Sequence, residues 1–320
     1  MQTDYEKYVK ETSDDISICL DSMGVQPILF VGSGISQRYF GGPTWESLLK
    51  DLSDQCPVLD KDYAYYKQKY RSLIEVGTVF SEAYREWAWD EGRNQFPDKL
   101  FSESQPPNIY IKHRVADYFE TLINSASAKK VEEKHNEEIA ALKNIRPHSL
   151  ITTNYDGFLE QVFPNYTRVI GQSILKANYA SVGEILKIHG CSTDPSSIVL
   201  TSSDYEEFRA KKKYLSAKLL TYFAEHPLVF LGYSAEDPNI RAILSDIDEI
   251  LSPHSELIPN IYLVEWDRDA TLRSSLHREK LITIDHERRN IGDRPRFHSS
   301  VSPQPAGNLE CKLSSLFLNY

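Results

Sequence analysis

Four short loops combine glycine with polar residues suited to binding a nucleotide, and each directly follows an apolar run. The first loop, after residues 27–31, is Gly32-Ser-Gly-Ile-Ser36. Its glycines permit a tight turn and close approach of the backbone to a ligand, and N–H groups at the start of a following helix suit a pyrophosphate. Because position 37 is Gln37, the loop is not a full GxGxxG motif, and no P-loop is present. An ordinary βα turn is an equally good interpretation.

The second loop is Thr153-Asn-Tyr-Asp-Gly157. It places Asn154 and Asp156 at the carboxyl end of a predicted strand, the edge where open α/β sheets bind ligands. The Asn154 amide could hold a ribose hydroxyl, another amide or a water, and Asp156 could accept hydrogen bonds from a carboxamide NH₂. A helix N-cap is an equally good interpretation of either residue.

The third and fourth loops also follow predicted strands. His189, in Lys187-Ile-His-Gly190, could act as a general base toward a hydroxyl. A histidine taken alone is nevertheless more often structural than catalytic. In the fourth loop, Gly232 and Ser234 could contact a nucleotide ribose and Asp237 could cap a helix. A plain loop fits these residues equally well, so the four loops are informative mainly as a set.

The elements that must position these loops alternate between short apolar runs and amphipathic stretches, as βα units do. Near-continuous apolar character is typical of strands buried on both faces. Six runs predict such strands: 27–31, 149–153, 184–188, 228–231, 261–265 and 281–284. The pattern predicts an α/β fold with a Rossmann-like, doubly wound parallel sheet, in which the carboxyl ends of the strands share one edge.

The residues between the first two strands predict an inserted all-helical subdomain. A stripe at three- and four-residue steps predicts one long helix: Tyr66, Tyr70, Leu73, Gly77, Phe80, Tyr84 and Trp87. This stripe favours core packing over a ligand groove. Further helices are predicted near 112–124 and 130–144. We therefore expect a sheet domain over 1–57 and 145–290, a helical insertion over 58–144 and an irregular segment over 291–320.

Composition excludes several classes of protein. The chain has 320 residues, of which 41% are hydrophobic and 26% are charged, and its formal net charge is −10. These values indicate a globular protein and disfavour nucleic acid or an anionic membrane as the main ligand. The basic run at 209–213 favours a solvated helix start. The polar amino terminus and short apolar runs predict a cytoplasmic protein with no signal peptide or membrane span.

The four motifs, in this order, resemble those of the sirtuin family. Gly32-Ser-Gly-Ile-Ser36 looks like the family's Gly-Ala-Gly-Ile-Ser loop, and Thr153–Gly157 looks like Gln-Asn-Ile-Asp-Gly. Lys187-Ile-His-Gly190 is similar to the catalytic histidine motif, and Gly232-Tyr-Ser234 stands where sirtuins have Gly-Thr-Ser. The resemblance covers about residues 25–290.

Two departures narrow the resemblance. Sirtuin deacetylases carry paired CxxC motifs for a structural zinc, whereas the corresponding interval here holds only Cys191, so no zinc module and no metal are expected. Pro43-Thr-Trp-Glu46 replaces the family's Pro-Asp-Phe-Arg. In both changes, and in the helical insertion, the chain resembles the sirtuin-like NAD hydrolases of bacterial antiviral defence. In length it resembles the stand-alone sirtuin-like subunit that works with a HerA-type ATPase.

The resemblance implies hydrolysis of NAD, as substrate, to nicotinamide and ADP-ribose. Asn154 would hold the nicotinamide ribose and could hold the attacking water, Asp156 would orient the carboxamide, and His189 would bind a ribose hydroxyl. The residues expected to bind the remainder of NAD are Gly32, Ser33, Gly34, Ile35, Ser36, Thr153, Gly232 and Ser234. Asp237 and Glu265 are weaker candidates for the same site.

Other functions stay open. A non-catalytic module that binds NAD or ADP-ribose in an assembly is the main alternative, and a zinc-free protein deacylase is a further one. A homo-oligomer, a HerA-type ATPase partner and gating by that partner or assembly are expected from the resemblance. The sequence shows no clustered acidic metal site that would place a nuclease activity.

Overall fold

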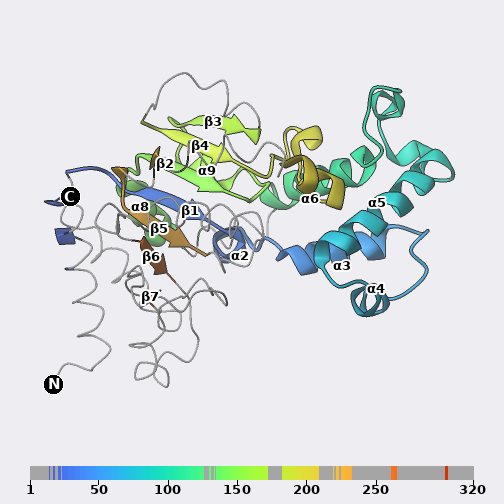
Figure 1. Cartoon of the computed structure of the whole chain (residues 1–320), viewed down its shortest axis with the longest axis horizontal. Helices are drawn as coiled ribbons and strands as arrows, with labels where there is room; N and C mark the ends of the chain where they lie inside the picture. Colours follow the sequence, from blue (N-terminus) through green and yellow to red (C-terminus); the bar gives the residue numbers. More distant parts are fainter. Residues whose placement is uncertain are drawn as a thin grey trace, which may run out of the picture.

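In a computed structural model of the chain, seven strands form one sheet in the order β3-β4-β2-β1-β5-β6-β7, and every paired strand runs parallel to its neighbour. The structure describes residues 24–125, 135–171, 182–208, 225–232 and 261–264, with isolated positions between and beyond these ranges. The predicted Rossmann-like parallel sheet is confirmed (Figure 1).

Five of the six predicted strands are present within a residue of their predicted bounds. They are β1 (Ile28–Val31), β2 (Ser149–Thr152), β4 (Glu184–Lys187), β5 (Leu228–Leu231) and β6 (Ile261–Val264). The sixth prediction, 281–284, lies outside the described residues. Two strands were not predicted: β3 (Thr167–Ile170) at one edge and β7 (Ser300–Val301), which falls within the segment predicted to be irregular.

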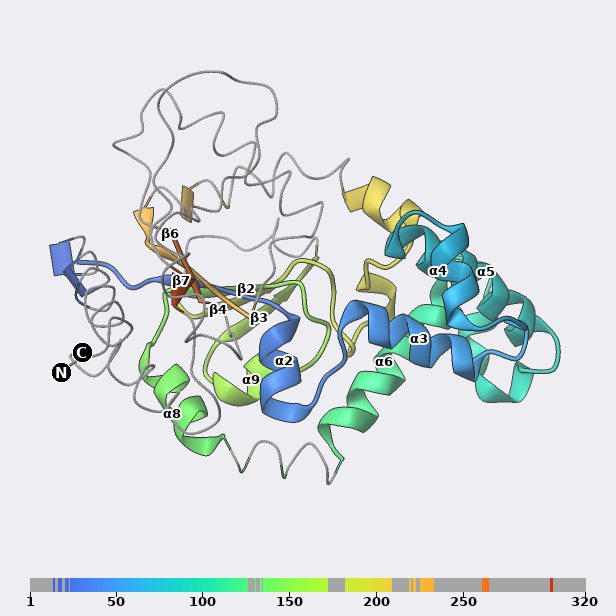
Figure 2. The ribbon, with the colours of Figure 1, turned by 90° about the horizontal axis from the view of Figure 1, so that it is seen from below.

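Three helices cover one face of the sheet (Figure 2). They are α2 (Ser33–Phe40), α8 (Asn136–Asn144) and α9 (Phe158–Val162). Their apolar side chains form one core with the inward-facing residues of β1, β2, β4 and β5. The opposite face is apolar as well, and there Phe30 stacks on Phe230 with ring centroids 5.0 Å apart. Burial on both faces explains why these strands read as continuous apolar runs.

A helical module lies beyond the carboxyl ends of the strands and has its own core (Figures 1 and 2). It contains α3 (Trp45–Gln55), α4 (Tyr63–Lys69), α5 (Leu73–Trp89), α6 (Ile109–Ile123) and the short 3-10 turns η1 (Arg93–Gln95) and η2 (Asp98–Phe101). The cores divide the chain differently from the predicted 58–144 boundary, because α3 packs in the helical module and α8 packs on the sheet.

The aromatic stripe forms two helices rather than the one predicted. Helix α4 ends before Tyr70, and α5 begins after Ser72, whose side chain accepts a hydrogen bond from the Glu75 amide. The Glu75 carboxylate in turn accepts from the amide of Arg71, the residue before the N-cap, so Ser72 and Glu75 form a variant of the capping box. The predicted core packing of the stripe is confirmed, since Phe80 and Tyr84 are fully buried.

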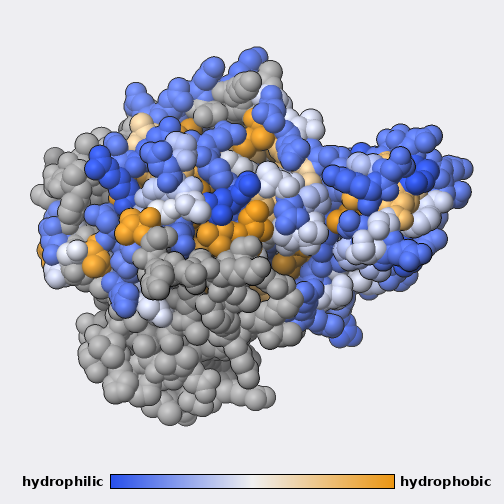
Figure 3. Space-filling view, turned by 90° about the horizontal axis from the view of Figure 1, so that it is seen from above, coloured by the Kyte–Doolittle hydropathy of each residue, from blue (hydrophilic) through white to orange (hydrophobic). Residues whose placement is uncertain are grey.

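The helical module protrudes from the sheet as an arm, and the face of this arm that is visible in Figure 3 is largely hydrophilic. Its few exposed aromatic side chains include Tyr65 and Trp89. Among the described helices, none is long and apolar enough to cross a membrane.

Candidate functional site

The loops after β1 and β5 interlock through glycines. A Cβ atom on Gly34 would lie 2.8 Å from both the Cα and the carbonyl oxygen of Gly232, and one on Gly232 would lie 2.5 Å from the Ile35 nitrogen. Gly232 also has a φ of 59°, in the left-handed region that favours glycine. The close approach predicted for Gly34 therefore occurs, but toward the neighbouring loop of the protein.

This contact uses main-chain donors that were expected to face a pyrophosphate. The Gly32 amide donates to Leu231 O at 2.9 Å, and the Gly34 amide donates to Gly232 O at 2.8 Å. Gly32 is the N-cap of α2, so the first residue of that helix is Ser33, which is exposed. A phosphate at the positive end of α2 would therefore meet Ser33 first, rather than the two glycine amides.

A chain of hydrogen bonds joins the first two loops beneath this turn. The Asn154 amide nitrogen donates to Gly32 O and to Ser36 Oγ, both at 2.9 Å, and Ser36 Oγ donates to Asp156 Oδ2 at 2.7 Å. Because a main-chain carbonyl can only accept, the bond to Gly32 fixes the orientation of the amide. Asn154 is half-buried, and no described residue bonds to its Oδ1, which leaves this acceptor for a ligand.

Asp156 is 3% exposed, and protein donors bind both of its carboxylate oxygens. Oδ1 accepts from the Phe158 amide at 3.0 Å at the start of α9. The N-cap of that helix is Gly157, so Asp156 bonds to the helix from the residue before the cap. Its carbonyl oxygen accepts from the buried Lys187 Nζ, which also lies 3.2 Å from Glu160 Oε1. Asp156 therefore holds the β1, β2 and β4 loops together, a role that spacing in the sequence did not reveal.

The loop after β4 brings His189 to the same edge of the sheet. Since Thr152 pairs with Lys187, Asn154 and His189 each lie two residues beyond the paired ends of adjacent strands. His189 is 3% exposed, and its ring lies 5.7 Å from that of Tyr205 and 5.5 Å from that of Phe208. Gly190, with a φ of 94°, makes the turn that follows.

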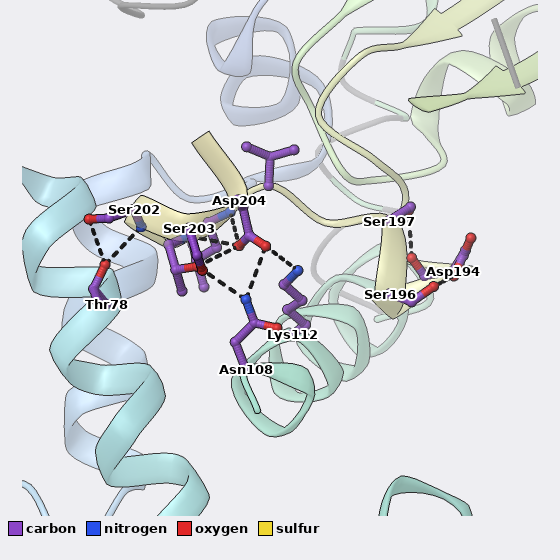
Figure 4. A network of polar contacts seen from close by, with 12 residues as sticks. Thr78, Asn108, Lys112, Asp194, Ser196, Ser197, Ser202, Ser203 and Asp204 are labelled. Atoms are coloured by element: carbon purple, nitrogen blue, oxygen red, sulfur yellow. Dashed lines mark hydrogen bonds and ion pairs between the residues drawn. The ribbon is translucent and has the colours of Figure 1, made fainter. Parts of the chain in front are cut away.

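A buried polar cluster fixes the chain that continues from His189 (Figure 4). Asp204 Oδ1 accepts from Lys112 Nζ at 2.6 Å and from Asn108 Nδ2 at 3.0 Å, and its Oδ2 accepts from the Thr201 amide at 2.9 Å. Burial raises the pKa of the Asp204 carboxyl, but the Lys112 charge and these hydrogen bonds outweigh burial, so its pKa lies below the ordinary value. The pattern Thr201-Ser-Ser-Asp204, which resembles a capping box, was the available signal for this cluster.

A cavity of about 800 Å³ lies between the helical module and the ends of β3 and β4. Lys112 and Asp204 line it, as do Ile188 and Val199 beside His189, whereas Asn154 and Asp156 do not. Val199 bonds directly to the His189 carbonyl at 2.9 Å. The cavity therefore borders the histidine loop rather than the first two loops.

The structure brings together Ser36, Asn154, Asp156 and, on the adjacent strand, His189, with Gly34 and Gly232 fixing the loops around them. Three predicted candidates lie outside the described residues: Ser234, Asp237 and Glu265. So does the basic run at 209–213. Within the part that the structure describes, no group of three or more His, Cys, Asp or Glu side chains is arranged to hold a metal ion.

Comparison with protein families matches residues 148–284 to the SIR2-like domain. This range includes the second, third and fourth loops, while the first loop precedes it. The sheet nevertheless places β1 between β2 and β5, so the Gly32–Ser36 loop is part of the same site.

Comparison with curated proteins finds two relatives above 30% identity. A protein named NAD(+) hydrolase ThsA from Enterococcus faecium is 36% identical over 115 residues, which are 31% of this chain and 22% of that protein. Defense-associated sirtuin 2 from Bacillus subtilis is 31% identical over 224 residues, which are 68% of this chain and 19% of that protein.

A longer match shares less identity. NAD(+) hydrolase ThsA from Acinetobacter baumannii is 22% identical over 272 residues, 82% of this chain and 48% of that protein. The chain thus spans between about a fifth and about half of the length of these relatives. Together, these matches show that residues 148–284 are similar to the SIR2-like domain and that the chain is similar to proteins named NAD(+) hydrolase ThsA and to one named Defense-associated sirtuin 2.

Proposed function

We propose that the chain is an NAD⁺ glycohydrolase that converts NAD⁺ and water to nicotinamide, ADP-ribose and a proton. The observation that carries the proposal is the hydrogen-bonded chain from Asn154 through Ser36 to Asp156, next to the N-terminus of α2 and one strand away from His189. Four relatives named NAD(+) hydrolase ThsA support it.

The pyrophosphate of NAD would lie at the first turn of α2, where the helix dipole and the exposed Ser33 favour an anion. Gly32, Gly34, Ile35 and Gly232 would shape this turn through their mutual contacts, and Thr153 and Ser234 would border it. Ser36 would act beneath the turn, by holding Asn154 and Asp156 in place.

The Asn154 Oδ1 would accept a hydrogen bond from the nicotinamide ribose or from the attacking water, because its amide nitrogen is already committed to the protein. His189 would bind a ribose hydroxyl and assist as base. Asp156 would orient the carboxamide, whose NH₂ group would join or replace the Ser36 hydroxyl as a donor to Oδ2. A polar site that excludes water stabilises the positive charge that develops on the ribose as the glycosidic bond breaks.

The biological setting that we propose is antiviral defence, in which depletion of NAD stops the host cell. The relative named Defense-associated sirtuin 2 supports this setting. An uncontrolled enzyme of this kind would kill its host, so we propose gating by a partner or by assembly. A homo-oligomer in the cytoplasm, working with a HerA-type ATPase, is the form of gating that we favour.

The test is to incubate the chain with NAD⁺, alone and with a HerA-type ATPase, with and without an acetyl-lysine peptide. Chromatography should show nicotinamide and ADP-ribose in equal amounts, independent of the peptide. Acetyl transfer that requires the peptide would favour the deacylase instead. Binding of NAD or ADP-ribose without turnover in any assembly would favour the non-catalytic module.

A further inference from the structure

We propose that Lys112 and Asp204 are positioning residues that couple the helical module to His189. The inference rests on the proposed function, since it assigns a role in the reaction that His189 would assist. It concerns a contact between α6 of the helical module and the helical residues 202–208, which follow the loop after β4.

Both side chains of the Lys112–Asp204 ion pair are largely buried. The Lys112 side chain is 4% exposed and that of Asp204 is 10% exposed, with Nζ and Oδ1 at 2.6 Å. A buried ion pair needs further hydrogen bonds to offset the loss of hydration. Asp204 receives them from Asn108 and from the Thr201 amide and hydroxyl, at 3.0, 2.9 and 2.8 Å. The carboxylate therefore joins α6 to the first turn of 202–208 in one arrangement.

Two further contacts act at the same place. The Thr78 hydroxyl of α5 accepts from the Ser202 amide at 2.8 Å and lies 3.0 Å from the Ser202 hydroxyl. A Cβ atom on Gly77 would lie 3.0 Å from the Leu200 carbonyl oxygen, so α5 packs closely on Leu200, two residues before Ser202. Two helices of the helical module, α5 and α6, therefore contact this turn.

The helical residues 202–208, which these contacts hold, pack on His189. Tyr205 is the residue after Asp204, and its ring lies 5.7 Å from that of His189, while Phe208, one turn further on, lies 5.5 Å from it. The Val199 amide bonds to the His189 carbonyl at 2.9 Å. The side chain and the main chain of His189 are therefore both held by the segment that Lys112 and Asp204 fix to the helical module.

The test is the double variant Lys112→Met/Asp204→Asn, which removes both charges. It keeps most of the length of the lysine side chain, the full length of the aspartate side chain and an acceptor for the Thr201 amide. We expect kcat for NAD⁺ hydrolysis to fall by about 10- to 100-fold, because small displacements of a catalytic group are costly, with KM changed less than about threefold. Hydrogen exchange should quicken in peptides covering 188–208.

The matched control is Arg38→Met/Glu138→Gln. This pair also joins two helices, α2 and α8, with both nitrogen–oxygen distances at 2.6 Å, but it does not contact the histidine loop. Its loss should lower the melting temperature without lowering kcat. If the first double variant does not fold, Thr78→Val, which removes the Ser202 contact and a bond to Ile74 O within α5, should give a smaller fall in kcat with KM unchanged.

An unchanged or increased kcat in folded Lys112→Met/Asp204→Asn, or an equal fall in the control, would overturn the role of the pair. A change in KM alone would also overturn it. These results differ from failure of the proposed function, which would appear as no NAD⁺ turnover by the wild-type chain in any assembly.

Discussion

At the scale of single residues, the site depends on groups that touch one another before any ligand is bound. Gly34 and Gly232 let two loops meet at van der Waals distance, and Ser36 links Asn154 to Asp156. Gly34 and Ser36 can each be compared with a residue of the same type outside these contacts, Gly157 and Ser53.

The first prediction concerns Gly34→Ala. Its new Cβ would lie 2.8 Å from the Gly232 backbone, which cannot move without displacing β5, so the free energy of unfolding should fall by about 1–3 kcal/mol. Gly157→Ala is the control, since nothing lies within 4 Å of its added Cβ. Urea denaturation that gives the same stability for both variants would contradict the interlocking of the two loops.

The second prediction concerns Ser36→Ala, which deprives Asn154 and Asp156 of one hydrogen bond each. Stability should fall by about 1–3 kcal/mol. NAD⁺ turnover should fall with it, because the Asn154 amide would then be held only by its bond to Gly32 O. Ser53→Ala removes the hydroxyl of another buried serine, which is bonded to Lys50 O, and should cost stability only. Full turnover by folded Ser36→Ala would refute the positioning role of this hydroxyl.

At the scale of elements, the sequence predicts those strands and helices whose burial shows as a local pattern of apolar residues. The central strands are buried on both faces and read as apolar runs, whereas only one of the four residues of β3, Val169, is buried, so this edge strand carries little apolar signal. The aromatic stripe keeps its three- and four-residue spacing across the break between α4 and α5. In the sequence, only the capping residues Ser72 and Glu75 mark this break. Lys112 and Asp204 are 92 positions apart, and no local pattern pairs them.

The third prediction concerns how the contribution of Asp204 to stability depends on pH. The pKa of Asp204 is lowered in the folded state, because the Lys112 charge and the hydrogen bonds outweigh burial. Its contribution to stability is therefore present above the unfolded pKa of about 3.9 and is lost as the pH falls through the folded value. The difference in melting temperature between wild type and Asp204→Asn should shrink from pH 6 to pH 3. A difference that stays constant or grows would contradict this sign.

At the scale of the whole molecule, two cores meet at the site. Tyr155, Ile198 and Leu200 follow sheet strands, yet they are buried in the core of the helical module. The module is therefore completed by residues that also flank Asn154 and His189. A change in the packing of the helical module would therefore reach the residues beside Asn154 and His189.

The fourth prediction follows from this shared core. Phe80→Ala, at a fully buried position of α5, should cost about 3–5 kcal/mol and should quicken hydrogen exchange in 189–201 as well as in the helical module. Tyr65→Ala, at a side chain that is 45% exposed, is the control and should change neither quantity much. Faster exchange confined to residues 45–123 would show that the module is energetically independent of the site.

The most direct test of the account is nicotinamide release from NAD⁺ by wild type beside Asn154→Ala and His189→Ala, each alone and with a HerA-type ATPase. We expect turnover by the wild type and a fall of at least about 100-fold in both variants, since one loses the free amide acceptor and the other the proposed base. Melting temperatures would confirm that the variants are folded. Full turnover by either variant would contradict the proposed role of that residue, and no turnover by the wild type under either condition would contradict the proposed activity.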